Sequence, residues 1–249
     1  MHNLGVRRKD SSSTAQPAED AESISIDVDD EVQVSGLLRL PASARALFVI
    51  AHGAGAGMRH PFLATVAKGL DSLGIASLRY QFPYMESRRK RPDPPALCHA
   101  TVRAAVSAAG RLVPGIPLIA GGKSFGGRMT SQAQAADPLP GVRGLAFLGF
   151  PLHPPRQPSD VRAAHLAQVL VPMLFLQGSR DEFAQLALLE PLIQRLGSRT
   201  RLALIEGADH SFHLSTHSGR TDADVLQAAL STLASWLDSL EPGRGENGR

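Results

Sequence analysis

Hydrophobic and polar positions follow two different periods along the chain. Near the N-terminus they alternate with a period of two, over residues 24–29 and 32–40, which predicts an antiparallel hairpin. Further on, short continuous apolar runs, typical of buried parallel strands, are separated by longer segments of helical periodicity. The predicted parallel strands are residues 47–51, 75–80, 116–120, 145–150, 173–177 and 202–206.

Helical segments fill the intervals between these strands. We expect them at residues 60–73, 95–109, 129–136, 159–169 and 222–240, and in a segment that follows Asp181 and ends near residue 196. Strands that alternate with helices imply right-handed crossovers and a mostly parallel sheet with helices on both faces, an α/β fold. The predicted domain is residues 23–240. The polar segments 1–22 and 241–249 are predicted to be disordered.

The stretch Gly122-Lys123-Ser124-Phe125-Gly126 has the form G-x-S-x-G and lies between a predicted strand and a predicted helix. In that context the motif predicts a nucleophile elbow, a sharp turn that presents a serine hydroxyl above the sheet. The glycines fit, because the returning helix leaves no room for side chains beside the strand. The motif alone leaves an ordinary glycine-rich turn open as the alternative, and a carboxylate and a histidine after later strands would decide between the two.

Both follow, each directly after a later strand. Asp181 comes after strand 173–177 and His210 after strand 202–206, so the order is serine, acid, histidine. A serine hydroxyl needs a base to take its proton, a histidine titrates near neutrality, and a carboxylate fixes the imidazole tautomer. The sequence therefore predicts Ser124, Asp181 and His210 as a catalytic triad.

Three further features complete the predicted site. The backbone N–H of Phe125 and one from Gly53 or Ala54, which follow the strand 47–51, are expected to form an oxyanion hole. Leu152 and His153, in a proline-rich segment, are expected to line one wall near Ser124 as substrate-binding residues. The interval 151–172 is too short for a large cap domain, so we expect an open site that accepts short acyl esters at least as well as long ones.

Composition narrows the class of protein. The 249 residues are 43% hydrophobic with a net charge of +3, an ordinary globular balance that requires no nucleic-acid partner. No run is long enough to span a membrane, and the N-terminus lacks a secretory apolar core. The single cysteine, Cys98, excludes an internal disulfide and favours the cytoplasm. No cofactor and no metal are expected.

Competing motifs are weaker. Gly122-Lys123-Ser124 ends like a phosphate-binding loop, but Pro117 occupies the position of its first glycine. The glycines at 53–57 lack the last glycine of a dinucleotide fingerprint, since residue 58 is methionine. His210, His213 and His217 have spacing that a metal site on a helix could use, although the segment reads as a loop. The basic run 88–91 is either a solvated loop or an attractor of anions.

Five phrases of the sequence stand out together: HGAGAG at 52–57, GKSFGGR at 122–128, LGFPLHP at 148–154, QG with RD at 177–181, and GADHSF at 207–212. They resemble the α/β-hydrolase superfamily and its dienelactone-hydrolase-like group. Within it they resemble a branch that includes testis-expressed protein thirty and the third regulatory subunit of the histone-acetylating NSL complex. The resemblance runs from about residue 46 to 240 and implies the triad Ser124, Asp181 and His210.

The resemblance implies no known substrate. Dienelactone hydrolases use cysteine where this chain has Ser124, which argues against dienelactone, and the nuclear relative shows that the fold can serve assembly instead. From residues and resemblance together we expect an α/β-hydrolase that hydrolyses a small-molecule ester or thioester through an acyl-enzyme, as a monomer or homodimer. The alternative is a catalytically silent hydrolase-fold protein that binds a partner.

Overall fold

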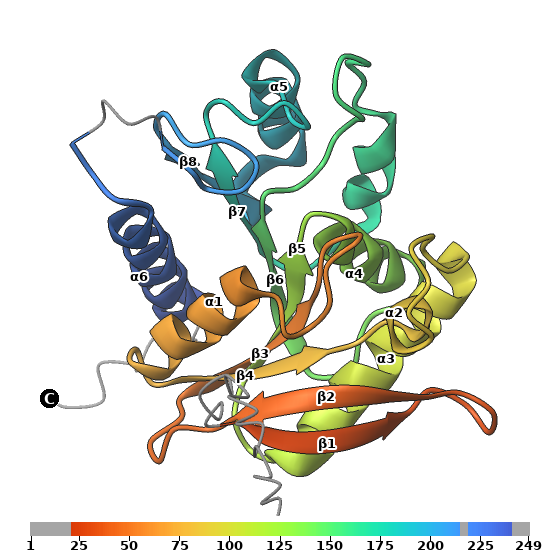
Figure 1. Ribbon diagram of the computed structural model, residues 1–249. Coiled ribbons are helices and arrows are strands. Elements are labelled where there is room, and N and C mark those ends of the chain that lie inside the picture. Colours follow the sequence, from red (N-terminus) through yellow and green to blue (C-terminus); the bar gives the residue numbers. More distant parts are fainter. Residues whose placement is uncertain (1–20, 215–218, 241–249) are drawn as a thin grey trace, which may run out of the picture.

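The computed structural model describes residues 21–214 and 219–240. Its centre is one eight-stranded sheet with the order β1-β2-β4-β3-β5-β6-β7-β8 (Figure 1). The first two strands pair antiparallel, β2 pairs antiparallel with β4, and the remaining neighbours are parallel. The strands are β1 Glu22–Asp27, β2 Gln33–Arg39, β3 Ala46–Ala51, β4 Ile75–Tyr80, β5 Leu118–Lys123, β6 Val142–Leu148, β7 Met173–Gly178 and β8 Thr200–Ile205.

Helices cover both faces of the sheet. Helices α1 and α6 pack on one face, and α3, α4, α5 and the 3₁₀ helix η1 lie on the other (Figure 1). This arrangement confirms the expected fold, without a large cap domain. The helices are α1 Pro61–Asp71, α2 Pro83–Glu86, α3 Pro95–Leu112, α4 Phe125–Ala136, η1 Val161–Gln168, α5 Leu186–Leu196, η2 Gly197–Arg199 and α6 Asp222–Leu240.

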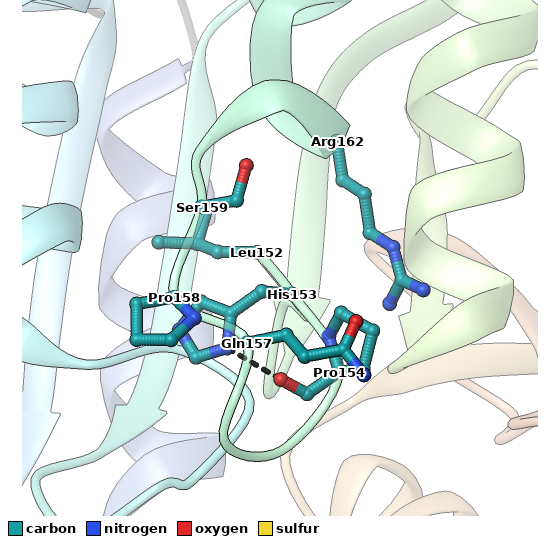
Figure 2. Close-up of a pocket in the computed structure, with 7 residues that line it drawn as sticks. All are labelled: Leu152, His153, Pro154, Gln157, Pro158, Ser159 and Arg162. Atoms are coloured by element: carbon teal, nitrogen blue, oxygen red, sulfur yellow. Dashed lines mark hydrogen bonds between the residues drawn. The ribbon is translucent and has the colours of Figure 1, made fainter.

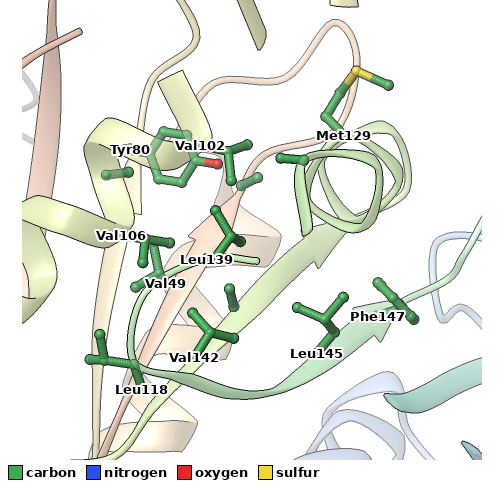
Figure 3. Packing of buried hydrophobic residues seen from close by; sticks show 14 of the residues in the cluster. Val49, Tyr80, Val102, Val106, Leu118, Met129, Leu139, Val142, Leu145 and Phe147 are labelled. Atoms are coloured by element: carbon green, nitrogen blue, oxygen red, sulfur yellow. The ribbon is translucent and has the colours of Figure 1, made fainter. Parts of the chain in front are cut away.

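Hydrophobic burial explains why the central strands read as continuous apolar runs. Every residue of β3, β4 and β7 is buried, because helices cover both of their sides. On one side the core includes Val49 and Tyr80 from the sheet, Val102 from α3 and Met129 from α4 (Figure 3). The predicted hairpin is confirmed as β1 and β2, where Ile26 faces the core.

Two predicted helices differ from the structure. The segment after β6 forms the 3₁₀ helix η1 instead of an α-helix, since its bonds from Ala163 N to Asp160 O and from Val169 N to Leu166 O span only three residues. Helix α5 begins at Leu186 and not directly after Asp181. The Asp181 carboxylate accepts a bond from Phe183 N, which holds the chain in a turn before the helix. Helix α2 was not expected.

The predicted terminal segments lie almost wholly outside the described residues, so their disorder stays a prediction. Strand β1 begins at Glu22, one residue earlier than the predicted domain. Within the described residues, no helix combines the length and the apolar character needed to cross a membrane.

Candidate active site

Ser124 occupies a strained turn between β5 and α4. Its φ of 49° lies in the left-handed region that non-glycine residues rarely adopt, as expected of a nucleophile elbow. A side chain at Gly122 or Gly126 would collide with the main-chain oxygen of Ala51 in β3. Strand β5 continues through Lys123, so the residues before Ser124 are strand and cannot form a phosphate-binding loop.

The structure brings the three predicted side chains together from the ends of β5, β7 and β8. The Ser124 hydroxyl lies 2.9 Å from His210 Nε2, and His210 Nδ1 lies 2.6 Å from Asp181 Oδ2. Since a carboxylate only accepts, Nδ1–H is the donor in that bond, which leaves the lone pair of Nε2 facing the serine hydroxyl. This is the arrangement that a base needs to take the serine proton.

Asp181 is buried and held through both of its oxygens. Gln177 Nε2 donates to Oδ2 at 2.5 Å, and the backbone N–H of Phe183 donates to Oδ1 at 2.7 Å. Gln177 is itself fixed, because its Oε1 accepts from Phe150 N at 2.8 Å. No role was predicted for Gln177, although a polar residue that ends an otherwise apolar strand is a signal for one.

The loop after β3 passes directly over Ser124. Gly53 and Ala54 line the same cavity as the serine, at the position expected for an oxyanion loop. The buried ring of His52 anchors this loop, since Nδ1 bonds to Gly53 O at 2.8 Å and Nε2 accepts from Phe82 N at 3.0 Å. Burial lowers the pKa of His52 to about 4, against the raising influence of Gly53 and Glu86, so the ring is neutral and structural.

Lys123 stands inside the motif and contributes to the site, although no role in it was predicted. Its ammonium donates to the main-chain oxygen of His210 and lies 5.8 Å and 5.3 Å from the ring centres of Phe62 and Phe212. Burial lowers its pKa to about 8, while the negative charges of Asp181 and Asp209 oppose that shift. Lys123 thereby ties the histidine loop to the elbow.

A cavity of about 750 Å³ opens at Ser124. Most of its walls are apolar and come from the first turns of α1 and α6, including Phe62, Leu63 and Leu226, together with Phe183 and Phe212. No large cap covers the site, as expected. The cavity nevertheless has side walls that were not predicted for an open site, because these two helices extend beyond the sheet. The basic run 88–91 is not part of its lining.

The predicted substrate contacts of Leu152 and His153 are not found in this cavity. Both side chains are buried, and they line a different cavity. The physical reason is that the backbone N–H groups of both residues donate to Phe183 O, at 2.8 Å and 3.1 Å, which places Phe183 between them and the triad. Phe183 forms the wall instead, with its ring centre 4.3 Å from that of His210.

Of the histidines weighed as a metal site, His210 and His213 are each engaged with a different carboxylate. His213 Nδ1 lies 2.5 Å from Asp222 Oδ2, and the hydrogen bond to this carboxylate raises the pKa of His213. His210 is bonded to Ser124 and Asp181, and His217 lies outside the described residues. Among the residues that the structure describes, no group of three His, Cys, Asp or Glu side chains is arranged to hold a metal ion.

Comparison with solved structures gives the same fold. Dienelactone hydrolase from Anabaena variabilis is 23% identical with a TM-score of 0.69, over 88% of this chain and 97% of that one. An α/β serine hydrolase without a lid from Xanthomonas campestris is 19% identical with a TM-score of 0.69, over 90% and 98%. Est1E from Butyrivibrio proteoclasticus, with ferulic acid bound, is 16% identical with a TM-score of 0.64, over 86% and 99%.

The family assignment rests on the sequence itself. Residues 44–238 match the alpha/beta hydrolase domain family, a span that holds the elbow, Asp181 and His210. That span includes every strand from β3 to β8 and nearly all of α6. The chain belongs to the alpha/beta hydrolase family.

Proposed function

We propose that this protein is a serine hydrolase that cleaves carboxylic esters or thioesters of small molecules through an acyl-enzyme. Ser124 is the nucleophile, His210 the general base and acid, and Asp181 the residue that orients the imidazole. The observation that carries the proposal is the continuous pair of hydrogen bonds from Ser124 through His210 to Asp181.

The reaction proceeds in two steps. His210 Nε2 takes the hydroxyl proton while Ser124 Oγ attacks the substrate carbonyl, and the oxyanion accepts bonds from the backbone N–H of Phe125 and of Gly53 or Ala54. His210 then gives its proton to the leaving alcohol or thiol, which leaves Ser124 acylated. A water molecule, deprotonated by His210, attacks the acyl-enzyme and releases the carboxylic acid and the free serine.

The apolar cavity supports an acyl group of moderate size. A volume of about 750 Å³ lies within the usual range for small-molecule sites, and rings from Phe62, Phe183 and Phe212 suit an apolar or aromatic acyl group. The ferulic acid bound to Est1E is a ligand of that kind in a similar fold. Membership of the branch with testis-expressed protein thirty, a cytoplasmic location and a monomeric or homodimeric state stay predictions.

Hydrolysis of p-nitrophenyl butyrate tests the proposal. Ser124→Ala should lower kcat by roughly 10⁴-fold or more, because a triad without its nucleophile retains only the contribution of binding and the oxyanion hole. The matched control is Ser231→Ala on the exposed face of α6, which should hydrolyse the ester at the wild-type rate. Equal rates for Ser124→Ala and the wild type would refute the assignment, and a folded wild type that does not exceed the uncatalysed rate would favour the silent, partner-binding alternative.

A further inference from the structure

A second cavity, of about 430 Å³, lies behind Phe183 and apart from Ser124. Its walls come from the extended segment 152–159 and from the start of η1, and its polar side chains are His153, Gln157, Ser159 and Arg162. Figure 2 shows Arg162 reaching down from η1, with the ends of Arg162 and Gln157 pointing toward one another near Pro154. No acidic residue contributes to this lining.

Arg162, which lines this cavity, has a second arginine near it, Arg128 of α4. Helices α4 and η1 are joined by a bond of 2.8 Å between Ser131 Oγ and His165 Nε2, and Arg128 and Arg162 each stand three residues before that pair. The two guanidinium groups are close enough to repel each other: burial, and then the charge of Arg162, lowers the pKa of Arg128. Within the described residues, neither arginine forms an ion pair with a carboxylate.

The neighbouring carboxylates are engaged elsewhere. Asp160, directly before η1, pairs with Arg195 at 2.6 Å. Asp137, at the end of α4, pairs with Arg103 at 3.0 Å. Two adjacent cations without a counterion are unfavourable in a partly buried place, and an anionic ligand would remove that cost.

His153 supplies a second, independent observation. Its side chain is 1% exposed, and its Nε2 has no hydrogen-bond partner. Because Nδ1–H donates to Pro154 O at 2.8 Å, the neutral ring keeps a lone pair on Nε2, which can accept a proton or a hydrogen bond from a ligand. A buried polar atom left without a partner is costly, so a ligand that supplies one is favoured.

We propose that Arg128 and Arg162 form a binding site for an oxyanion, a phosphate or carboxylate group of a small molecule, with Gln157 and His153 as further polar contacts. Planar guanidinium groups match both anions with two parallel hydrogen bonds each. The site adjoins the elbow, since Arg128 Cζ lies 5.8 Å from the ring centre of Phe125, the residue after the nucleophile. The anion therefore belongs either to the substrate, on its leaving-group side, or to a separate effector.

Binding of inorganic phosphate and of acetate, measured by isothermal titration calorimetry, tests the site without any assumption about the reaction. Saturable binding is expected in the wild type and equally in Ser124→Ala, so failure of the proposed hydrolase activity would leave this test intact. Arg162→Gln should weaken binding at least tenfold, as should Arg128→Gln. The exposed control Arg201→Gln on β8 should bind as the wild type does.

The sources of the anion are separated by kinetics with a neutral p-nitrophenyl ester and with one that carries a carboxylate on its leaving group. If the anion belongs to the substrate, phosphate competes with the charged ester and Arg162→Gln raises the KM of that ester alone. If it is an effector, phosphate changes the rate with the neutral ester without competing. Absence of saturable binding of both anions to the wild type would overturn the proposal. Wild-type affinity for these anions in a folded Arg162→Gln variant would also overturn it. So would a loss of anion binding in the control Arg201→Gln as large as that in Arg162→Gln.

Discussion

The two cavities on either side of Phe183 differ in how their charged groups are satisfied. Around Ser124 the walls are apolar, His213 is paired with Asp222, and Lys123 donates to the His210 carbonyl between two aromatic rings. Beside η1, Arg162 faces the cavity with no carboxylate partner among the described residues. The difference indicates that the first cavity is suited to an uncharged acyl group and the second to an anion.

The largest effect that would separate the two regions is expected from Asp181→Asn. Without the carboxylate, His210 is no longer held in the tautomer that has its proton on Nδ1 and a free lone pair on Nε2. It then cannot take the serine proton efficiently, so kcat should fall by about 10⁴-fold. Phosphate binding beside η1 should be unchanged. The adjacent, exposed Glu182 provides the control, and Glu182→Gln should keep full activity. Equal activity of Asp181→Asn and the wild type would show that another group orients His210.

A smaller effect is expected from the length of the acyl chain. Each methylene that enters the apolar cavity gains roughly 0.8 kcal/mol, about fourfold in kcat/KM. We expect kcat/KM for p-nitrophenyl esters to rise from acetate to medium chains and to stop rising before palmitate, which differs from the sequence-based expectation that short esters are hydrolysed at least as well as long ones. A flat series from acetate to octanoate would mean that acyl chains do not enter this cavity.

A substitution that narrows the cavity tests whether acyl chains enter it. Ala223 is exposed and lines the cavity at the start of α6, so Ala223→Trp should lower kcat/KM for medium-chain esters more than for acetate. Ala228→Trp, further along α6 and outside the lining, is the control and should leave the series unchanged. An identical chain-length series in both variants would argue against the α1–α6 wall as the acyl site.

Lys123→Met tests the link between the elbow and the histidine loop. The variant keeps the apolar stem but loses the bond to the His210 carbonyl, and a shift of the base by about 1 Å can cost up to roughly 10²-fold in rate. We expect kcat to fall about tenfold with little change in KM or Tm. The exposed Lys68→Met is the control. A lower Tm with an unchanged kcat would assign Lys123 a structural role alone.

The smallest effect concerns acid stability. Burial lowers the pKa of His52, in the loop after β3, and of His165, in η1, to about 4 each, and the charge of Arg128 adds to the shift of His165. In the unfolded chain the pKa of histidine is near 6.5, so between about pH 4 and 6.5 the unfolded chain binds more protons than the folded protein. The free energy of unfolding should therefore fall as the pH decreases from about 6.5 to 4. Urea unfolding at several pH values measures this. His52→Gln should reduce the slope, and an unchanged slope would show that His52 is not its source.

Much of the fold was predictable because the pattern of hydrophobic residues in the sequence indicates which segments are buried. Continuous apolar runs marked β3 and β7, and the period-two alternation marked β1 and β2. Asp181 and His210 were found because parallel strands bring their carboxyl ends to one edge of the sheet, so a residue directly after a strand is placed by topology alone.

The misses arose where contacts far apart in sequence decide the geometry. Leu152 and His153 turn away from Ser124 because Phe183 O holds their backbone, and no local pattern reports that bond. The walls from α1 and α6 meet only in the folded chain. Lys123 was overlooked because a lysine beside a serine has no periodic signature, and its role depends on the His210 carbonyl.

Labelling with a fluorophosphonate probe tests the central claim, that Ser124 is activated by His210, most directly. We expect covalent modification of the wild type on the peptide that contains Ser124. We expect no labelling of Ser124→Ala and strongly slowed labelling of His210→Ala, with all three proteins folded as judged by circular dichroism. A folded wild type that resists probes of several sizes, or a Ser124→Ala protein that labels as the wild type does, would contradict it.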